Sequence, residues 1–131
     1  MYALDTNIVI KLIRGNEEVN KHREEAILQG ISLVIPIVVD YEIMRGFHYK
    51  NAAEKERLYC ALKARHGLGD ITSTTWEIAA QIHSNLRKKG YTVGDNDILI
   101  AAFCIENDYT LVTKNIKDFE NVPGLKLTDW S

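Results

Sequence analysis

The chain has 131 residues, of which 46% are apolar and 26% are charged, and its net charge is −2. This length is enough for one compact domain with a buried core, and we expect a single domain over residues 1–131. The composition excludes a collagen-like or disordered chain, and the net charge excludes the overall basic footprint of a duplex-binding protein.

In the first half of the chain, short apolar runs alternate with amphipathic stretches bounded by glycines and turn-forming residues. Pro36 is expected to open a helix, because its missing N–H is not needed there. The inner face of that helix is expected to carry Ile37, Tyr41, Met44 and Phe47. The predicted elements are a strand at 2–4, helices at 8–13 and 17–29, a strand at 31–35, and helices at 36–47 and 52–65.

The second half continues the same alternation and contains one almost wholly apolar helix, which must be buried on most sides. Its predicted elements are a strand at 70–72, a helix from a cap at Thr74 or Thr75 to residue 89, the apolar helix at 98–105, and strands at 110–113 and 125–127. The pattern predicts an α/β fold with a short, mostly parallel central sheet flanked by helices. The functional crevice of such a sheet lies beyond the carboxyl ends of its strands.

Nothing in the sequence predicts export or membrane insertion. The first residues lack a basic region followed by a cleavable apolar run, and the apolar stretches fall short of the about 18 residues that a membrane span needs. We therefore expect a soluble, cytoplasmic protein. Cys60 and Cys104 do not make a disulfide framework, and Cys104 is expected to be a buried, unreactive thiol.

Several carboxylates are predicted at the carboxyl edge of the sheet. Asp5 follows the first strand, Asp97 begins the buried helix, and Glu42 lies in the helix that leaves the second strand. Asn115 and Asp118 follow the fourth strand. Each of these residues also has an ordinary alternative role, as a helix cap, a turn residue or a surface glutamate.

The combination of these acids favours a metal site. Carboxylates that converge without matching basic residues raise each other's pKa unless a cation relieves them. Hard oxygen ligands suit Mg²⁺, or Mn²⁺ as a substitute, better than zinc. A divalent ion held there can activate water and neutralise charge on a phosphodiester, so the pattern indicates phosphodiester hydrolysis.

Four segments, spread over the chain in order, resemble the motifs of PIN domains and in particular of VapC ribonucleases, the toxins of type II toxin–antitoxin systems. They are Leu4-Asp5-Thr6-Asn7-Ile8, Tyr41-Glu42-Ile43, the segment from Gly94 to Ala102, and the segment from Leu111 to Phe119. The resemblance implies a PIN fold and a metal-dependent endoribonuclease.

The resemblance also implies roles for individual residues. Asp5 and Asp97 would be the principal metal ligands, and Glu42 would complete the site directly or through water. In many PIN domains a fourth acid stands two residues after the threonine of the last motif. That position is Asn115 here, so Asp118 is the candidate that either replaces the fourth acid or only shapes the loop.

Neighbouring residues receive supporting roles. Thr6 and Asn7 are expected to orient Asp5 or a bound water, whereas Asp95 is expected to cap its helix in preference to binding metal. Because an acidic pocket repels RNA, nearby cations should hold the phosphates. The candidates for that role are Arg45, Lys50 and Arg87.

The family resemblance further implies an RNA substrate, plausibly a tRNA such as initiator tRNA, and a cognate antitoxin that blocks the site. A homodimer or a higher toxin–antitoxin assembly is expected as well. Two alternatives compete with this interpretation. A phosphatase of the haloacid-dehalogenase kind needs an aspartate where Asn7 stands, and this residue opposes it. A PIN-fold RNA- or protein-binding module with little or no catalysis is favoured only by Asn115.

Overall fold

The computed structural model describes residues 1–50 and 52–130, without the side chain of Lys50. Twelve elements lie in this part of the chain. They are β1 (Tyr2–Leu4), α1 (Thr6–Ile13), α2 (Glu17–Leu28), β2 (Leu33–Pro36), α3 (Ile37–Lys50), α4 (Ala53–His66), β3 (Leu68–Gly69), α5 (Ser73–Lys88), α6 (Asp95–Asn107), β4 (Thr110–Val112), α7 (Ile116–Phe119) and β5 (Lys126–Thr128).

The described strands form one parallel sheet in the order β3-β2-β1-β4-β5. Strand β1 is central, and its residue Ala3 pairs with Val34 of β2 and with Leu111 of β4. Because all strands run the same way, the loops that follow them gather at one edge. The predicted α/β fold with a short parallel sheet and flanking helices is confirmed.

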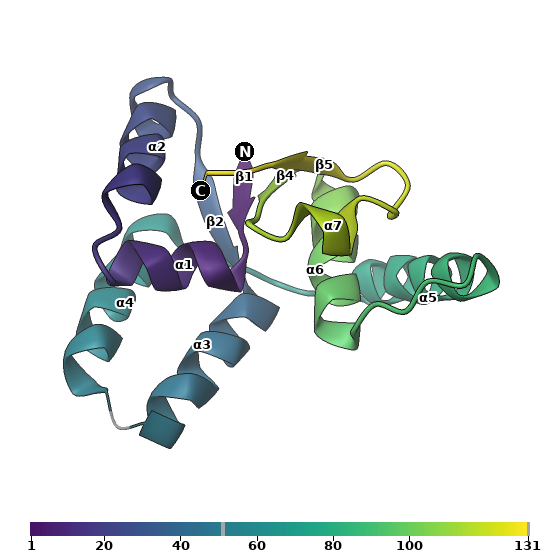
Figure 1. The fold of residues 1–131 in the computed structure, drawn as a ribbon, viewed down its shortest axis with the longest axis horizontal. Coiled ribbons are helices and arrows are strands. Elements are labelled where there is room, and N and C mark those ends of the chain that lie inside the picture. The colour runs from purple at the N-terminus through teal and green to yellow at the C-terminus, as the bar shows by residue number, and fades with distance from the viewer. Residues whose placement is uncertain (51, 131) are drawn as a thin grey trace.

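The helices cover the sheet unequally. Figure 1 shows α1 to α4 gathered on one side of β1 and α5 to α7 on the other, with α5 extending away from the sheet. The predicted apolar helix is α6, whose residues Ile100, Ala101 and Ala102 are fully buried. Cys104 of the same helix is also buried, as expected. Among the helices of the described residues, none is both long and apolar enough to cross a membrane.

The strand predicted at 70–72 is wrong, because the third strand is Leu68–Gly69. Gly69 allows the strand to lie directly against α6, where a Cβ on this residue would overlap the ring of Phe103. Residues 70–72 instead lead from β3 into α5.

The cap predicted for α5 is also misplaced by two or three residues. The N-cap is Thr72, and Thr75 completes a capping box with it. The hydroxyls of both threonines donate to the carboxylate of Glu106 on α6. The start of α5 is therefore set by a contact with another helix.

The inner face of α3 differs from the prediction. Val39, Ile43 and Phe47 are buried at a spacing of four residues, whereas Ile37 is 37% exposed and Tyr41 58% exposed. The helix thus turns the side that carries Tyr41 toward solvent. The row at 39, 43 and 47 is the one buried in the core. The prediction was therefore right for Phe47 and in part for Met44, which packs partly buried against the core, and wrong for Ile37 and Tyr41.

Three smaller differences concern the ends of elements. Pro36 closes β2 and does not open the helix after it. Gly94 is the N-cap of α6, so the prediction that Asp95 caps this helix is wrong, and Asp95 is its first residue. The short helix α7 was not predicted, and it carries Asp118.

Candidate active site

Asp5 is held at the end of β1 by two hydrogen bonds. Its Oδ1 accepts from the backbone N–H of Thr6 at 2.8 Å, and its Oδ2 accepts from the hydroxyl of Thr113 at 2.7 Å. The carboxylate caps α1 and is only 4% exposed. Burial raises its pKa, the two hydrogen bonds oppose that rise, and the negative charge of Asp118 adds to it.

Thr6 connects Glu42 to Asp5. The hydroxyl of Thr6 donates to Oε1 of Glu42 at 3.0 Å, so one residue bonds both carboxylates. On its other side, Oε2 of Glu42 lies 3.9 Å from a guanidinium nitrogen of Arg45. That guanidinium lies over the ring of Tyr41, 5.1 Å from its centroid. Glu42 therefore lies between a hydroxyl donor and a half-exposed cation.

Asp97 lies in the first turn of α6, where the helix dipole favours negative charge. Its pKa is nevertheless raised to about 6, first by burial and then by the charges of Asp5, Glu42 and Asp118. The charges of these three carboxyls act on Asp97 in addition to its burial. Thr6 bonds both Asp5 and Glu42, and Asp97 and Asp118 line one cavity. The structure thus brings the four predicted acids to one edge of the sheet.

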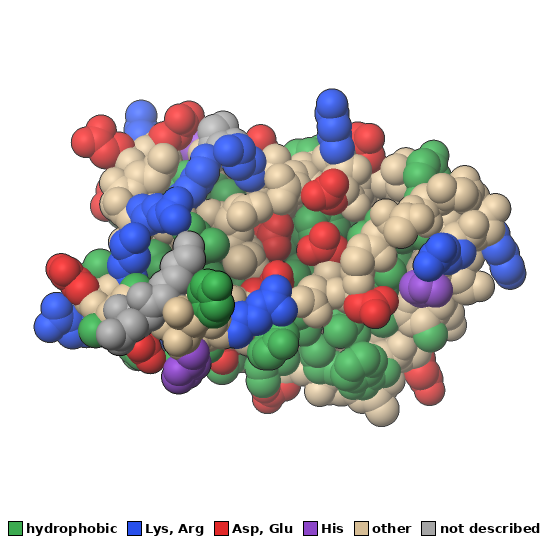
Figure 2. All heavy atoms as spheres, turned by 60° about the horizontal axis from the view of Figure 1, so that its bottom comes forward, with side chains coloured by type: hydrophobic (Ala, Val, Ile, Leu, Met, Phe, Trp, Pro, Cys, Tyr) green, Lys and Arg blue, Asp and Glu red, His purple; other side chains and the backbone are tan. Residues whose placement is uncertain are grey.

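A cavity of about 290 Å³ opens beside these acids. It is lined by residues of the loop before α6, of the start of α6, and of the α7 segment: Tyr91, Thr92, Val93, Gly94, Asp97, Lys117, Asp118 and Asn121. Figure 2 looks onto this edge and shows acidic side chains gathered in the middle of the face, with lysines and arginines in a row along one flank. The cavity offers both a carboxylate wall and a cation, Lys117.

A second hollow, of about 170 Å³, reaches Glu42 from the other side. Its floor is apolar, and its lining includes Ile43, Phe47, Arg14 and Lys55. Two cations and an apolar floor therefore border the acidic site between α1, α3 and the start of α4.

The donor chemistry fits a hard divalent cation, since the groups that converge are carboxylates. As the side chains stand, no three His, Cys, Asp or Glu residues in the described parts of the chain are close enough to hold a metal ion together. Direct ligation by Asp5, Glu42 and Asp97 at once would therefore need side-chain movement, or water between an acid and the ion.

The remaining predicted site residues are distributed as follows. Asn115 contributes its backbone N–H, which donates to the hydroxyl of Thr113 at 3.0 Å, while its side chain makes no capping bond. Asp118, in contrast, lines the cavity with Asp97. Asn7 lies in α1 and Asp95 is exposed, and neither lines the cavity.

The three proposed RNA-binding cations have different outcomes. Arg45 is beside Glu42, as described above. Arg87 lies in the last turn of α5, the helix that extends away from the sheet, and it lines neither hollow (Figure 1). The side chain of Lys50 lies outside the described part of the structure.

Sequence reasoning missed two residues that the geometry makes important. Thr113 is fully buried and donates to Asp5 across 108 residues of sequence, which only the β1–β4 pairing reveals. Lys117 lies one residue before Asp118 and lines the same cavity. The sequence did offer a signal for Lys117, because this residue follows the predicted strand at 110–113 and precedes Asp118, which was already a candidate site residue.

Comparison with known proteins agrees with this geometry. Residues 2–125 match the model of the PIN domain. The chain is 31% identical over 129 residues to Ribonuclease VapC1 of Rickettsia felis, covering 95% of this chain and 92% of that one. It is 28% identical over 130 residues to the tRNA(fMet)-specific endonuclease VapC of Salmonella typhimurium, covering 98% and 97%. Among solved structures, VapBC2 of Rickettsia felis bound to a promoter DNA fragment superposes with a TM-score of 0.89 at 27% identity, over 99% and 98% of the two chains.

A parallel α/β sheet with acids clustered at its carboxyl edge, together with the match over residues 2–125, defines a PIN-domain protein. The chain belongs to the PIN-domain family. Its 31% identity to Ribonuclease VapC1 of Rickettsia felis over 95% of its length places it among the VapC ribonucleases within that family.

Proposed function

We propose that this protein is a Mg²⁺-dependent endoribonuclease, with Mn²⁺ as a substitute, that acts as the toxin of a type II toxin–antitoxin pair. The observation that carries the proposal is the set of four acids at one edge of the sheet, where burial and then repulsion from the other three raise the pKa of Asp97. A cation relieves such repulsion. The whole of residues 1–131 would form one PIN domain.

In this proposal Asp5, Glu42 and Asp97 hold the ion, directly or through water, and Asp118 adds negative charge nearby. The bound ion would supply an activated water and offset the charge that develops on the phosphodiester. The protein's own part is orientation. Thr113 and the N–H of Thr6 hold Asp5, and the hydroxyl of Thr6 holds Glu42.

Cations around the acids would hold the RNA backbone away from them. Arg45 is next to Glu42, Lys117 lines the cavity with Asp118, and Arg14 and Lys55 border the second hollow. Phosphate contacts of this kind position a nucleic acid without reading its sequence. A tRNA is the proposed substrate, because a relative 28% identical over nearly the full length is a tRNA(fMet)-specific endonuclease.

The proposed partners follow from the solved relatives. The similar structure from Rickettsia felis is a VapBC complex, so we propose a cognate antitoxin for this chain as well, with a homodimer or a larger toxin–antitoxin assembly in the cytoplasm. Expression of the chain alone should slow bacterial growth, and co-expression of a small partner encoded next to it should restore growth. Unaffected growth would oppose the toxin role while leaving nuclease activity open to direct assay.

The direct test is cleavage of structured RNA by the purified protein. Cleavage is expected with Mg²⁺ or Mn²⁺ and should stop when EDTA is added. Sequencing of RNA ends after brief induction in cells should show cuts concentrated in one or a few tRNAs. Cleavage that continues unchanged in EDTA would contradict the metal-dependent mechanism, and ends scattered over messenger RNA would contradict the tRNA substrate.

One observation favours a second function, an RNA- or protein-binding module of PIN fold with little catalysis. Within the described residues no three potential ligands are assembled for direct metal binding, and Asn115 replaces a fourth acid. Metal titration separates the two functions. Tight RNA binding that is independent of Mg²⁺, with no cleavage at any metal concentration, would favour the binding module.

A further inference from the structure

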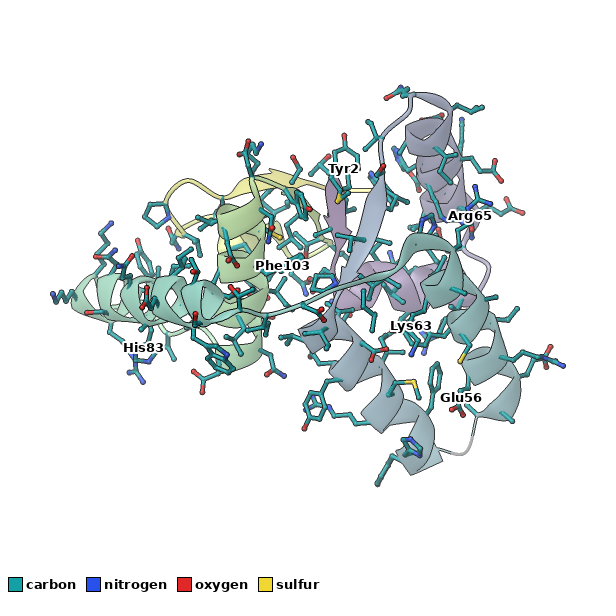
Figure 3. The ribbon with its side chains drawn as sticks, turned by 180° about the vertical axis from the view of Figure 1, so that it is seen from behind. Tyr2, Glu56, Lys63, Arg65, His83 and Phe103 are labelled. Atoms are coloured by element: carbon teal, nitrogen blue, oxygen red, sulfur yellow. The ribbon has the colours of Figure 1, made fainter. Side chains whose placement is uncertain are left out.

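A cluster of basic side chains, two arginines and a histidine, lies at the opposite edge of the sheet. Arg23 comes from α2, and Arg65 and His66 come from the end of α4. The Nε–H of Arg23 donates to Nε2 of His66 at 2.9 Å and joins the two helices. Figure 3 shows Arg65 where the end of α4 meets α2.

The imidazole in this cluster is kept neutral. Burial, followed by the charges of Arg23 and Arg65, lowers the pKa of His66 to about 4. Burial and the charge of Arg65 also lower the pKa of Arg23. Since Nε2 of His66 accepts from Arg23, the ring proton of the neutral imidazole is on Nδ1. Apart from the bond between Arg23 and His66, the polar groups of the three side chains are hydrogen-bond donors.

Two hollows adjoin the cluster and share the side chains of Arg65 and Ile27. One, of about 340 Å³, is also lined by Ser32 and His66. The other, of about 390 Å³, is also lined by Arg23 and by one acid, Glu24. Ser32 immediately precedes β2, so these hollows lie at the amino edge of the sheet and away from Asp5.

The positive charges of the cluster are not balanced by the ion pairs of the described residues. Those ion pairs are Arg45–Glu42, Lys63–Asp40 and Lys126–Asp108, and none of them includes Arg23 or Arg65. The charge of Glu24 acts favourably on Arg23, but the charge of Arg65 acts on it more strongly in the opposite sense. Holding two guanidiniums together in this way costs free energy, and a bound anion recovers it.

We propose that Arg23, Arg65 and His66 form a binding site for a tetrahedral oxyanion of the phosphate type. Guanidinium groups match such an anion with forked, charge-assisted hydrogen bonds. The Nδ1–H of His66 and the hydroxyl of Ser32 add neutral donors at the same place. The site shares no residue with the acidic edge and goes beyond the proposed nuclease function.

The same phosphate chemistry can come from two sources, the backbone of a bound RNA or free inorganic phosphate. The two are separated by testing the site first with a small anion and then with RNA. Neither test requires cleavage, so a failure of the proposed ribonuclease activity does not affect the result.

The first test follows the histidine rings of the full chain by NMR during pH titration. Sodium sulfate, a stand-in for phosphate that stays doubly charged, is compared with sodium chloride at equal ionic strength. A bound anion favours imidazolium, so sulfate should raise the pKa of His66 by about half a unit or more, while exposed His48 and His83 stay unchanged. Equal sulfate shifts at His66 and at these two controls would overturn the proposal.

Matched variants test whether the arginines cause the effect. Arg65→Gln removes one positive charge from α4 and should reduce the sulfate shift of His66 at least twofold. Arg57→Gln removes the same charge from an exposed position of the same helix and should leave it unchanged. The proposal fails if the two variants respond to sulfate alike.

The second test measures RNA binding in EDTA by fluorescence anisotropy at several salt concentrations. With a backbone phosphate as the ligand, the Arg23→Gln/Arg65→Gln variant should bind RNA several-fold more weakly than Arg57→Gln. The dependence of log K on log salt should also become shallower by about 0.7 for each single-strand phosphate that the variant no longer neutralises. Unchanged RNA affinity together with the sulfate response would support the site with free phosphate as its ligand.

Discussion

The two edges of the sheet carry clusters of opposite charge, and they are organised to different degrees. At the carboxyl edge Asp5 is held by two donors, and Thr6 bonds Glu42 as well. At the amino edge a single hydrogen bond, from Arg23 to His66, joins the charged groups. Both clusters place like charges together, but only the acidic cluster has its key side chain, Asp5, held by two hydrogen bonds.

This difference follows from where the buried polar contacts of the chain lie. Among the buried residues, Asp5 and Thr113 are polar and bonded to each other. A buried, fully bonded pair costs little when satisfied and much when one partner is lost. The carboxyl edge should therefore respond to substitution by loss of activity and stability, and the amino edge by changes in charge-dependent behaviour.

The largest effect is expected for Asp5→Asn. The variant keeps an oxygen that can cap α1, but its amide cannot accept from both Thr6 and Thr113 and carries no charge for a metal ion. RNA cleavage should fall by about 100-fold or more, beyond the loss typical of a residue that only supports a metal ligand. Single-turnover cleavage of a tRNA with Mg²⁺ measures this, with circular dichroism to verify folding.

The matched control for this variant is Asp95→Asn, the same change at an exposed acid in the first turn of α6. Its cleavage rate should stay within about twofold of the unaltered chain, as expected for a surface position. Normal turnover by the Asp5→Asn enzyme would show that the acidic edge is not the reaction centre.

A smaller loss is expected for Thr113→Val, which keeps the shape of a fully buried side chain but removes its hydroxyl. Oδ2 of Asp5 and the N–H of Asn115 both lose their partner, so the free energy of unfolding should fall by about 1–3 kcal/mol. Cleavage should fall about tenfold because Asp5 is no longer oriented. Urea unfolding and the cleavage assay measure the two effects.

Thr110→Val is the comparison, since Thr110 begins β4, the strand that Thr113 directly follows, and donates no side-chain hydrogen bond in the described structure. Its stability should change by less than about 0.5 kcal/mol. Equal losses for both threonines would mean that the contact with Asp5 contributes nothing specific.

A several-fold effect is expected for Asp118→Asn, because Asp118 lines the cavity with Asp97 and its charge adds to the rise that burial gives to the pKa of both Asp97 and Asp5. The Mg²⁺ concentration for half-maximal cleavage should rise about three- to tenfold as one negative charge leaves the site. Glu120→Gln, at an exposed position just after α7, should leave it unchanged. An unaltered Mg²⁺ requirement in Asp118→Asn would reduce this residue to a loop-shaping role.

The sequence predicted the elements that hydrophobic period and turn residues define. The strands at 2–4 and 110–113, the apolar helix and the parallel sheet followed from these local signals. The clustering of Asp5, Glu42, Asp97 and Asp118 also followed, since acids placed after parallel strands share one edge. That they serve as metal ligands stays a prediction.

Features that depend on contacts between distant segments could not be predicted from hydrophobic period and turn residues. The third strand is at Leu68–Gly69 because a glycine fits against Phe103, and α5 begins at Ser73 because its cap, Thr72, donates to Glu106. The amino-edge cluster is of the same kind. Arg23 and His66 are 43 residues apart and meet only when α2 and α4 are placed together.

The smallest expected effect, at the amino edge, is a change in how stability depends on pH. His66 has an ordinary pKa of 6.5 when unfolded and of about 4 when folded, because of burial and the charges of Arg23 on α2 and Arg65 on α4. Between these values the unfolded chain binds the extra proton, so the contribution of His66 to stability is present above pH 6.5 and is lost as the pH falls toward 4. Glu24, the acid in the adjoining hollow, acts on Arg23 in the sense opposite to Arg65.

His66→Gln should remove that pH dependence, since a glutamine oxygen can still accept from Arg23 but does not titrate. Between pH 7 and pH 4.5 the unaltered chain should lose about 1 kcal/mol more stability than the variant, a value reduced for solvent screening at this half-buried site. His83→Gln, at an exposed position on α5, should follow the unaltered chain. If the free energy of unfolding of the unaltered chain and of His66→Gln depended on pH in the same way, burial and the two arginines would not hold the imidazole neutral. The contrast between the two edges would then rest on the acids alone.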